Sequence, residues 1–466
     1  MATLTFYGAA QEVTGSCYLL ESPAIGKVLL ECGMHQGGDA IERLHEESFA
    51  FKARDIDAVI LSHAHLDHSG MLPRLVREGF DGPIYCTTAT RDLLKIMLKD
   101  SANLYLRDLE RENLRLKRGG QKTVHAEYRM QDVNKVLKLC ETTGYNKPVT
   151  IGHSQLRFHD AGHILGSSIV ELTLAEDGRD KKLVFSGDLG NNDSVLMNNH
   201  TLLKQADIVL MEGTYGDRNH RSRPDTLNQL EEVLHSAWQQ GGTVLIPSFA
   251  VGRTQEILFH LGCLFYQGKL DNWQVFLDSP MAIEVTKVYD RWIHLLSDDD
   301  IRCLNENDRY SLENFLPTLN LSITTEDSIA INRIKKGAII IAGSGMCTGG
   351  RIRPHFRHRI WQKNTTVIFT GFQARGTLGR LLVDGIKKIR LFNEDIVVKA
   401  RIETLGGLSA HAGQDALVNW AKSFENQPVM VLVHGEPNAL DALAARLWKE
   451  LGIKARIPLV GQSIAF

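Results

Sequence analysis

Four potential metal ligands lie within six residues, directly after a short apolar run at residues 58–62: His63, His65, Asp67 and His68. Imidazole and carboxylate groups are ligands that zinc and similar divalent ions accept. Alternate residues of an extended backbone point the same way, so His63 and His65 can face one ion while Asp67 and His68 face another. A histidine-rich surface loop without metal is the alternative, although polar groups at the tip of a strand usually serve a function. The question is then whether the rest of the chain supplies further ligands at the end of this strand.

The same arrangement recurs at three distant places in the chain. His163 follows the apolar run at 155–159, and Asp188 follows the run at 182–186. His434 comes directly after another apolar run, and glycine lies next to each of these three residues. One histidine after a strand is more often a structural residue, but the repetition favours convergence at one edge of a sheet. Ligands that are distant in sequence are typical of a catalytic metal centre, whereas a structural zinc site favours closely spaced cysteine pairs.

Together these residues resemble the signatures of the metallo-β-lactamase fold and, within it, of the β-CASP nucleases that process RNA. Glu31 is similar to the first signature, residues 63–68 to the second, His163 to the third and Asp188 to the fourth. The signatures of the β-CASP branch fall on Glu212, His411 and His434, and further similar stretches lie at 247–256, 278–281, 343–351 and 370–380. The resemblance extends over nearly the whole chain.

The resemblance implies an α/β fold in which an α/β cap interrupts a four-layer αββα sandwich. The expected limits are 1–205 and 393–466 for the metallo-β-lactamase domain and 206–392 for the β-CASP domain. Alternating strand and helix patterns from about residue 207 support the insertion independently, because this alternation is typical of a parallel sheet with crossover helices. Before it, strands are expected at 4–7, 16–21, 27–31, 58–61 and 83–86, and helices at 71–78, 90–99 and 102–118.

By resemblance, the site holds two zinc ions, with manganese as the alternative. The implied ligands are His63, His65 and His163 for one ion, Asp67, His68 and His434 for the other, and Asp188 between them. Asp67 and Asp188 therefore count among the catalytic residues. Glu31 would fix the tautomer of a ligand imidazole. Glu212 would orient His411, which would protonate the leaving oxygen.

The implied activity is hydrolysis of phosphodiester bonds in single-stranded RNA, similar to that of the endonuclease subunit of the eukaryotic pre-mRNA 3′-end processing complex. Two alternatives stay open: a hydrolase of small esters or thioesters, and a silent partner that binds RNA without cutting it. The chain departs from the family at Glu31, where aspartate is usual, and at Gly413, where most members have an acidic residue. The balance of endonuclease and exonuclease activity, the preferred RNA and 5′ end, the pathway and the native metal stay open.

Composition narrows the setting. The 466 residues carry a net charge of −2, so any surface that binds RNA must be local. Candidate RNA contacts are Arg253, Arg351, Arg353 and Arg375, whereas the basic groups at 115–118 and 387–390 are interpreted as ordinary surface. The seven cysteines include no Cys-x-x-Cys pair, which argues against a disulfide framework. Neither a signal peptide nor a membrane span is indicated, and we expect a cytoplasmic protein, with a homodimer as a further expectation.

Overall fold

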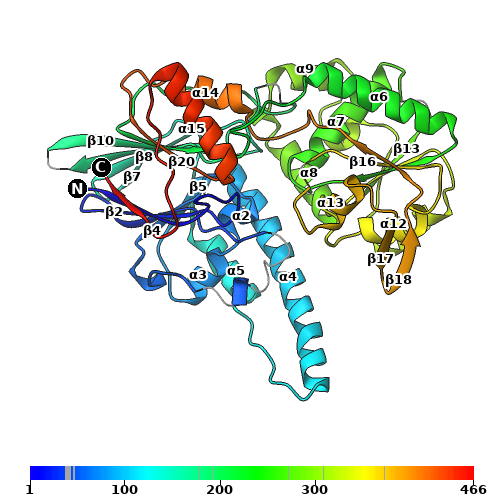
Figure 1. The fold of residues 1–466 in the computed structure, drawn as a ribbon, viewed down its shortest axis with the longest axis horizontal. Coiled ribbons are helices and arrows are strands. Elements are labelled where there is room, and N and C mark those ends of the chain that lie inside the picture. Colours follow the sequence, from blue (N-terminus) through cyan, green and yellow to red (C-terminus); the bar gives the residue numbers. More distant parts are fainter. Residues whose placement is uncertain are drawn as a thin grey trace. The chain divides into compact units, whose positions relative to one another are not determined.

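The chain folds into two units in a computed structural model that describes residues 1–36, 43–45, 48–176, 178–192, 194–270, 272–307, 309–371 and 373–466 (Figure 1). The first unit comprises Met1–Asn192, Asn199–Asn219 and His411–Phe466, and the second comprises Asp193–Asn198 and His220–Ala410. Both ends of the chain therefore belong to the first unit, and the second unit is an insertion into it. The α/β class and the insertion of one α/β unit into another, both predicted from the sequence, are confirmed.

The limits of the insertion differ from the expected residues 206 and 392 because strand pairing holds residues at both junctions. Strand β11 (Ile208–Glu212) lies between β10 (Arg179–Phe185) and β20 (Val429–Val433), which keeps it in the first unit. Strand β19 (Arg401–Thr404) pairs with β16 (Thr365–Phe369), which keeps it in the second unit. Both junctions therefore fall later in the chain than the sequence patterns indicate.

Two sheets form the centre of the first unit. In the described residues, one sheet has seven strands in the order β21-β1-β2-β3-β4-β5-β6, and the other has six in the order β20-β11-β10-β9-β8-β7. Apolar side chains that alternate along the strands, such as Phe6 and Phe158, fill the space between the sheets. The remaining strands are β1 (Thr3–Gly8), β2 (Cys17–Ser22), β3 (Gly26–Leu30), β4 (Ala58–Ile60), β5 (Ile84–Thr87), β6 (Cys140–Thr143), β7 (Val149–Ile151), β8 (Ser154–Asp160), β9 (Ser168–Glu176) and β21 (Ser463–Ala465).

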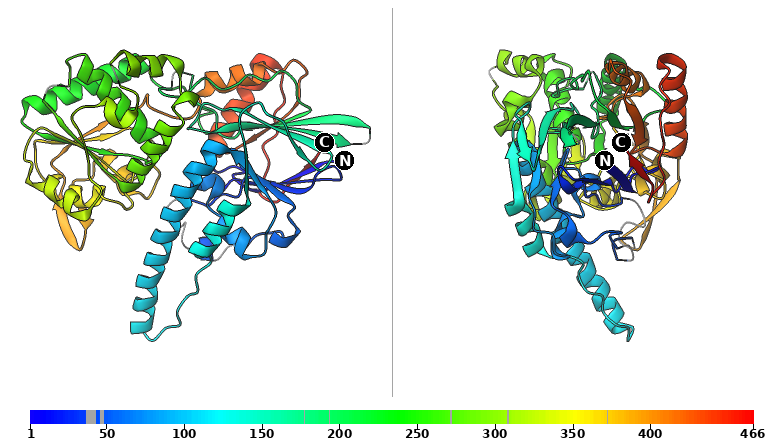
Figure 2. Two further views of the ribbon diagram at one scale, coloured as in Figure 1. Left: turned by 180° about the vertical axis from the view of Figure 1, so that it is seen from behind. Right: turned by 90° about the vertical axis from the view of Figure 1, so that its left-hand side faces the viewer.

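Helices cover the outer faces of both sheets and complete the four layers (Figures 1 and 2). Helices α14 (Gln414–Lys422) and α15 (Pro437–Leu451) bury Trp420 and Leu443 against the second sheet. The other sheet is covered by α3 (Leu72–Arg77), α4 (Thr88–Arg118) and α5 (Met130–Leu139), with α2 (Leu66–Ser69) at the end of β4.

Helix α4 is a single helix of 31 residues, whereas the sequence predicts two helices at 90–99 and 102–118. The side chain of Thr87 caps its start by accepting a hydrogen bond from the backbone of Thr90, 3.2 Å away. Leu94, Leu98, Ala102 and Tyr105 continue one buried stripe at helical spacing, and no proline or glycine interrupts it. The helix ends where Gly119 and Gly120 were expected to stop it.

The second unit contains the predicted parallel sheet, whose order in the described residues is β14-β13-β15-β12-β16-β19. Its inner strands at 243–247 and 338–342 are buried on both faces and therefore read as continuous apolar runs. The remaining strands are β12 (Thr243–Pro247), β13 (Gln274–Asp278), β14 (Leu319–Leu321) and β15 (Ala338–Ala342), with a separate hairpin of β17 (Lys388–Leu391) and β18 (Glu394–Val397). The helices are α6 (Arg223–Gln239), α7 (Arg253–Tyr266), α8 (Pro280–Arg291), α9 (Asp298–Glu306), α10 (Leu312–Phe315), α11 (Thr325–Ala330), α12 (Ile352–Arg359) and α13 (Leu378–Val383). None of the helices in the described ranges has the length and apolar character needed to cross a bilayer.

Candidate metal centre

The histidine-rich run is placed by the end of β4 and the start of α2. His63 and His65 lie in the turn between these elements, and Asp67 and His68 lie on α2 itself. The hydroxyl of Ser69 donates to the carbonyl oxygens of Ala64 and His65, at 3.0 and 2.9 Å, and so fixes the turn. Because the backbone changes from extended to helical within six residues, the four side chains reach the site from two directions.

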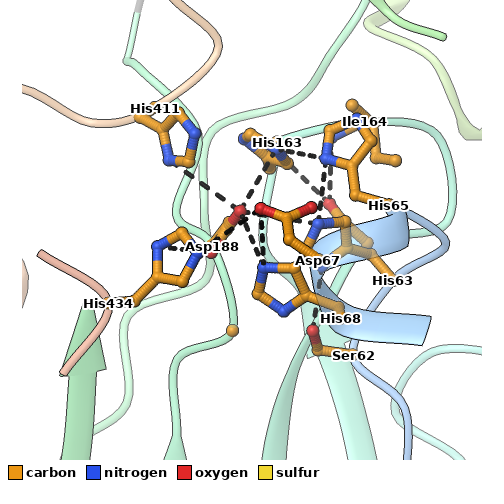
Figure 3. A network of polar contacts seen from close by, with 12 residues as sticks. Ser62, His63, His65, Asp67, His68, His163, Ile164, Asp188, His411 and His434 are labelled. Carbon is orange, nitrogen blue, oxygen red and sulfur yellow. Dashed lines mark hydrogen bonds and ion pairs between the residues drawn. The ribbon is translucent and has the colours of Figure 1, made fainter. Parts of the chain in front are cut away.

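The three distant ligands reach the same place from the second sheet (Figure 3). His163 lies in the loop between β8 and β9, Asp188 follows β10, and His434 follows β20. Strands β10, β11 and β20 are parallel, so their carboxyl ends meet at one edge of the sheet. Gly187 has a φ of +54°, and a Cβ atom built there would lie 2.8 Å from the hydroxyl of Ser62. Only glycine therefore allows the backbone before Asp188 to approach the histidine-bearing loop so closely.

His63, His65, His163 and Asp188 form the first group of ligand atoms. The Nδ1 atom of His65 lies 3.1 Å from Nε2 of His63 and 3.3 Å from Nε2 of His163. The Oδ2 atom of Asp188 lies 3.5 Å from His63 and 3.6 Å from His163. Ligand atoms around a tetrahedral zinc ion are separated by about 3.3 Å, given zinc–nitrogen bonds of about 2.0–2.1 Å. The spacing therefore fits one ion.

Asp67, His68 and His434 form the second group, beside Asp188. The Oδ2 atom of Asp67 lies 3.9 Å from Nε2 of His68 and 3.7 Å from Nε2 of His434. The Oδ2 atom of Asp188, which contacts the first group, also lies 3.4 Å from Nε2 of His68, and its Oδ1 atom lies 3.5 Å from Nδ1 of His434. Asp188 is therefore placed to serve both groups.

The chemistry of the donors also fits metal ions. Among the described residues, the buried atoms Nε2 of His68, Nε2 of His434 and Oδ1 of Asp188 make no hydrogen bond. Buried polar atoms are rarely left without such a partner, and a cation supplies one. Burial lowers the pKa of His65 to about 4 although Asp67 and Asp188 oppose this change, so its imidazole is neutral and offers a lone pair. The donor set and its spacing therefore fit a site for two metal ions.

Glu31 lies behind the second group. It is fully buried and has a φ of +67°, and its Oε1 atom accepts a hydrogen bond from the backbone N–H of Ser62 at 2.7 Å. Its Oε2 atom lies 3.3 Å from Nδ1 of His68, on the side of the ring away from Asp67 and Asp188. The longer glutamate side chain thus contacts both the loop and a ligand imidazole.

Glu212 and His411 form a separate pair at the edge of the cluster. The Nδ1 atom of His411 lies 3.3 Å from Oε1 of Glu212 and 3.9 Å from Asp188. Burial opposes the charged form of His411, but Glu212 and Asp188 outweigh it and raise the pKa to about 9. Glu212 also accepts the backbone N–H groups of Leu189 at 2.7 Å and Thr214 at 3.3 Å. These two bonds fix the carboxylate, and its Oε1 atom also faces His411, so Glu212 is placed to orient that imidazole.

Two contacts of the ligand side chains are not predicted by the sequence. The hydroxyl of Ser62 lies 2.9 Å from Nδ1 of His63, and the hydroxyl of Thr214 lies 3.1 Å from Nδ1 of His434. Both hydroxyls face the ring nitrogen opposite the ligand atom and so fix the orientation of the imidazole. Ser62 adjoins the histidine run and Thr214 adjoins Glu212, and this proximity is the only signal that the sequence offers for them.

The four arginines predicted to contact RNA all lie in the second unit and differ in their surroundings. Arg253 is buried and pairs with Glu256. Arg351 donates to Asp278 and to the backbone of Ser322 and Ile323, so its guanidinium is engaged within the fold. Arg353 is partly exposed and donates to the carbonyl of Thr348 at 3.2 Å, and Arg375 is exposed. Of the four, Arg375 is the most accessible.

Comparisons with known proteins agree with the fold and the site. Three family models match: the metallo-beta-lactamase superfamily over residues 10–144, the Beta-Casp domain over 254–382, and a Zn-dependent metallo-hydrolase RNA specificity domain over 395–458. A crystal structure of a protein of unknown function from Enterococcus faecalis V583 is similar over 100% of both chains, with a TM-score of 0.56 and 14% identity. At that identity the similarity concerns the fold alone.

Curated relatives are similar over nearly the whole chain. Ribonuclease TTHA0252 of Thermus thermophilus is 38% identical over 95% of this chain and 95% of its own length. An RNase J-like protein of Methanocaldococcus jannaschii is 30% identical over 99% of both chains, and the transcription termination factor FttA of Methanothermobacter thermautotrophicus is 31% identical over 98% of this chain and 71% of its own length. The chain therefore belongs to the β-CASP family of metallo-β-lactamase RNA nucleases.

Proposed function

We propose that the chain is a zinc-dependent ribonuclease that cuts single-stranded RNA internally. The observation that carries this proposal is the Glu212–His411 pair next to Asp188, within a set of seven ligand side chains. When bound, two zinc ions supply Lewis acidity and an activated water for attack on the phosphodiester. Their proposed ligands are His63, His65 and His163 for one ion and Asp67, His68 and His434 for the other, with Asp188 shared.

His411 is proposed to hold the proton for the leaving oxygen. Its Nδ1 atom faces Glu212, so Nε2 is the ring nitrogen that can present a proton to the substrate. Glu212 is held by two backbone N–H groups and keeps the imidazole in one orientation. The products would carry a 3′-hydroxyl and a 5′-phosphate, because the 3′ oxygen leaves when water attacks phosphorus.

Three further expectations stay predictions. These are a cytoplasmic location, a homodimer, and manganese as a substitute for zinc, since histidine and aspartate ligands accept both ions. Light scattering of the purified protein tests the homodimer. Metal analysis after purification from cells grown without metal supplementation tests the native ion.

The experiment that tests the function is cleavage of an internally labelled circular RNA by the zinc-loaded protein. We expect cutting that is lost in Asp188→Ala and reduced about 10²- to 10⁴-fold in His411→Ala. His153→Ala, which removes an exposed histidine of the same unit, is the matched control and should cut normally. If the protein cuts linear RNA but not circular RNA, its activity is that of an exonuclease and not of an endonuclease. If it hydrolyses a thioester and cuts no RNA, the small-ester alternative is favoured.

A second substrate separates proton donation by His411 from a structural role. In an RNA with sulfur in place of the 3′ bridging oxygen, the leaving thiolate needs no proton. The ratio of wild-type to His411→Ala rates should therefore fall towards one on this substrate, whereas the Asp188→Ala defect should persist. An unchanged His411→Ala defect would rule out proton donation by this side chain.

A further inference from the structure

The second half of α4 and the segment after it form an arm, defined here as residues 102–129, which projects from the sheets of the first unit (Figures 1 and 2). Asn113 joins the two parts of the arm: its side chain donates to the carbonyl of Val124 at 2.9 Å and accepts the N–H of Val124 at 2.7 Å. Closer to the sheets, the hydroxyl of Tyr105 accepts the N–H of Glu127 at 2.9 Å. The arm is therefore a built structure, in which the return segment is fixed against the helix.

The start of α4 is attached to the loop that carries the ligand His163. The hydroxyls of Thr87 and Thr90 both donate to the carbonyl of Gly166, at 2.7 and 2.8 Å. From this attachment the helix runs for 31 residues, or about 46 Å at 1.5 Å per residue. A contact made at the tip is thus remote from the metal centre but held in a fixed relation to it.

The tip of the arm, residues 115–125, is basic in a chain whose acidic and basic residues are almost balanced. It contains Arg115, Lys117, Arg118 and Lys122, together with His125, and no acidic residue, whereas the whole chain has 55 Asp and Glu residues against 53 Lys and Arg residues. In the part of the chain that the structure describes, Arg115 makes one exposed contact of 3.8 Å with Glu112, and no ion pair holds Lys117, Arg118 or Lys122.

Stabilisation of the helix end explains only part of this charge. Cations in the last turn interact favourably with the helix dipole, which accounts for Arg115, Lys117 and Arg118. Lys122 lies on the return segment, beyond the helix, and gains nothing from that effect. The positive charge is therefore gathered from two segments onto one exposed surface.

A hollow of about 740 Å³ between α4 and the return segment adjoins these charges. Leu114 and Val124 line it and are 51% and 40% exposed, and Lys117 and His125 also line it. Apolar side chains beside cations suit a single-stranded nucleic acid, whose bases need an apolar surface and whose phosphates need positive charge.

We propose that the arm tip is a second RNA-binding site, which holds phosphates of the substrate strand away from the scissile bond. The proposal rests on the ribonuclease function proposed above and adds where the strand is held. Lysine and arginine side chains that are free of ion pairs bind phosphates through release of condensed cations, without reading sequence. The site therefore favours long RNAs over short ones and does not select among sequences.

The test compares a short and a long RNA with the triple variant Lys117→Gln, Arg118→Gln, Lys122→Gln. The short strand is chosen with an extended length well below that of α4, and the long strand has at least twice that length. We expect the KM for the long RNA to rise about tenfold at unchanged kcat, with no change for the short RNA. The salt dependence of long-RNA binding should weaken, with the slope of log K against log salt falling by about 2, at about 0.7 per phosphate.

The matched control is the triple variant Lys422→Gln, Lys449→Gln, Lys454→Gln. These lysines are exposed, two of them lie near the C-terminal ends of helices, and their loss removes the same charge from another face of the same unit. The three tip side chains are also exposed, so both variants should keep the wild-type melting temperature.

Three outcomes would overturn the proposal: an unchanged KM for the long RNA, an equal loss on both RNAs, or the same loss in the control variant. An unchanged KM would favour an acidic protein as the binding partner of the charged tip. If the wild-type protein cuts neither RNA, the ribonuclease function fails instead. In that case, the affinity of the wild-type protein and of the tip variant for the long strand, measured by fluorescence anisotropy at several salt concentrations, tests the arm site without cleavage.

Discussion

Replacing Glu31 by glutamine should weaken metal binding although the two side chains have nearly the same shape. The Oε1 atom of Glu31 accepts the N–H of Ser62 at 2.7 Å, and Oε2 lies 3.3 Å from Nδ1 of His68. When Nε2 of His68 binds metal, Nδ1 carries the proton and is a donor. Both partners are therefore donors, and a carboxylate accepts from both. An amide accepts with its oxygen only, and its NH₂ group must then face a second N–H group.

The magnitude follows from the role of this contact. Loss of a carboxylate that supports a ligand imidazole typically costs about 10- to 100-fold in metal affinity, or about 1.4 to 2.7 kcal/mol. Because Glu31 is fully buried, no water can substitute easily for the missing acceptor. We expect one of two zinc sites to weaken by this factor in Glu31→Gln, since only His68 of the second ligand group contacts Glu31.

Competition between the protein and a chromophoric zinc chelator measures the zinc affinities of both sites in one titration. Glu21→Gln is the matched control, because Glu21 lies in β2 of the same sheet and pairs at the surface with Lys27. Its two zinc affinities should equal those of the wild-type protein. Glu31→Gln with both affinities within about twofold of the wild type, and with an unchanged melting temperature, would refute the reasoning from donors and acceptors.

Three further predictions concern stability. Chelation of zinc should lower the melting temperature measured by differential scanning calorimetry, because an ion present at 100 times its dissociation constant contributes about 2.7 kcal/mol to the free energy of unfolding. In Asp188→Asn, most of this difference in melting temperature between the zinc-loaded and the chelated protein should disappear. His159 and Lys182 hold the pKa of Glu171 at about 2, below its ordinary value, so Glu171→Gln should cost about 2 kcal/mol in urea unfolding at pH 7 and progressively less as the pH falls from about 4.5 towards 2. Trp420→Ala should cost about 3–5 kcal/mol because the ring is fully buried, whereas Trp448→Ala, at 61% exposure, should stay within about 0.5 kcal/mol by the same assay.

The strand ends, and the candidate ligand residues that come together there, can be predicted from the sequence because both depend on local pattern. An apolar run followed by a polar turn residue predicts the ends of β4, β10 and β20, where three parts of the site begin. The alternation in the second unit likewise identifies its parallel sheet. These signals lie within a few residues and need no knowledge of distant segments.

Partners that come from distant segments could not be predicted in this way. The contact between Thr214 and His434 depends on how β11 pairs with β20. The limits of the inserted unit depend on the pairing of β11 within the first unit and of β19 with β16 in the second. The charged stretch at 115–118 reads as ordinary surface in the sequence because its surroundings become visible only when Asn113 fixes the return segment beside it.

Two residues at the site, one from each sheet of the first unit, have a left-handed backbone conformation. Glu31 and His434 have φ values of +67° and +51°, a left-handed conformation that costs about 1 kcal/mol or more for residues other than glycine. Backbone bonds hold both residues there: Glu31 donates to the carbonyl of Ile60 at 3.0 Å, and His434 donates to the carbonyl of Ala9 at 2.8 Å. Glycine would relieve the strain but would remove the side chain that the turn aims. The backbone of each sheet therefore holds one of these side chains at the site in a conformation that carries this cost.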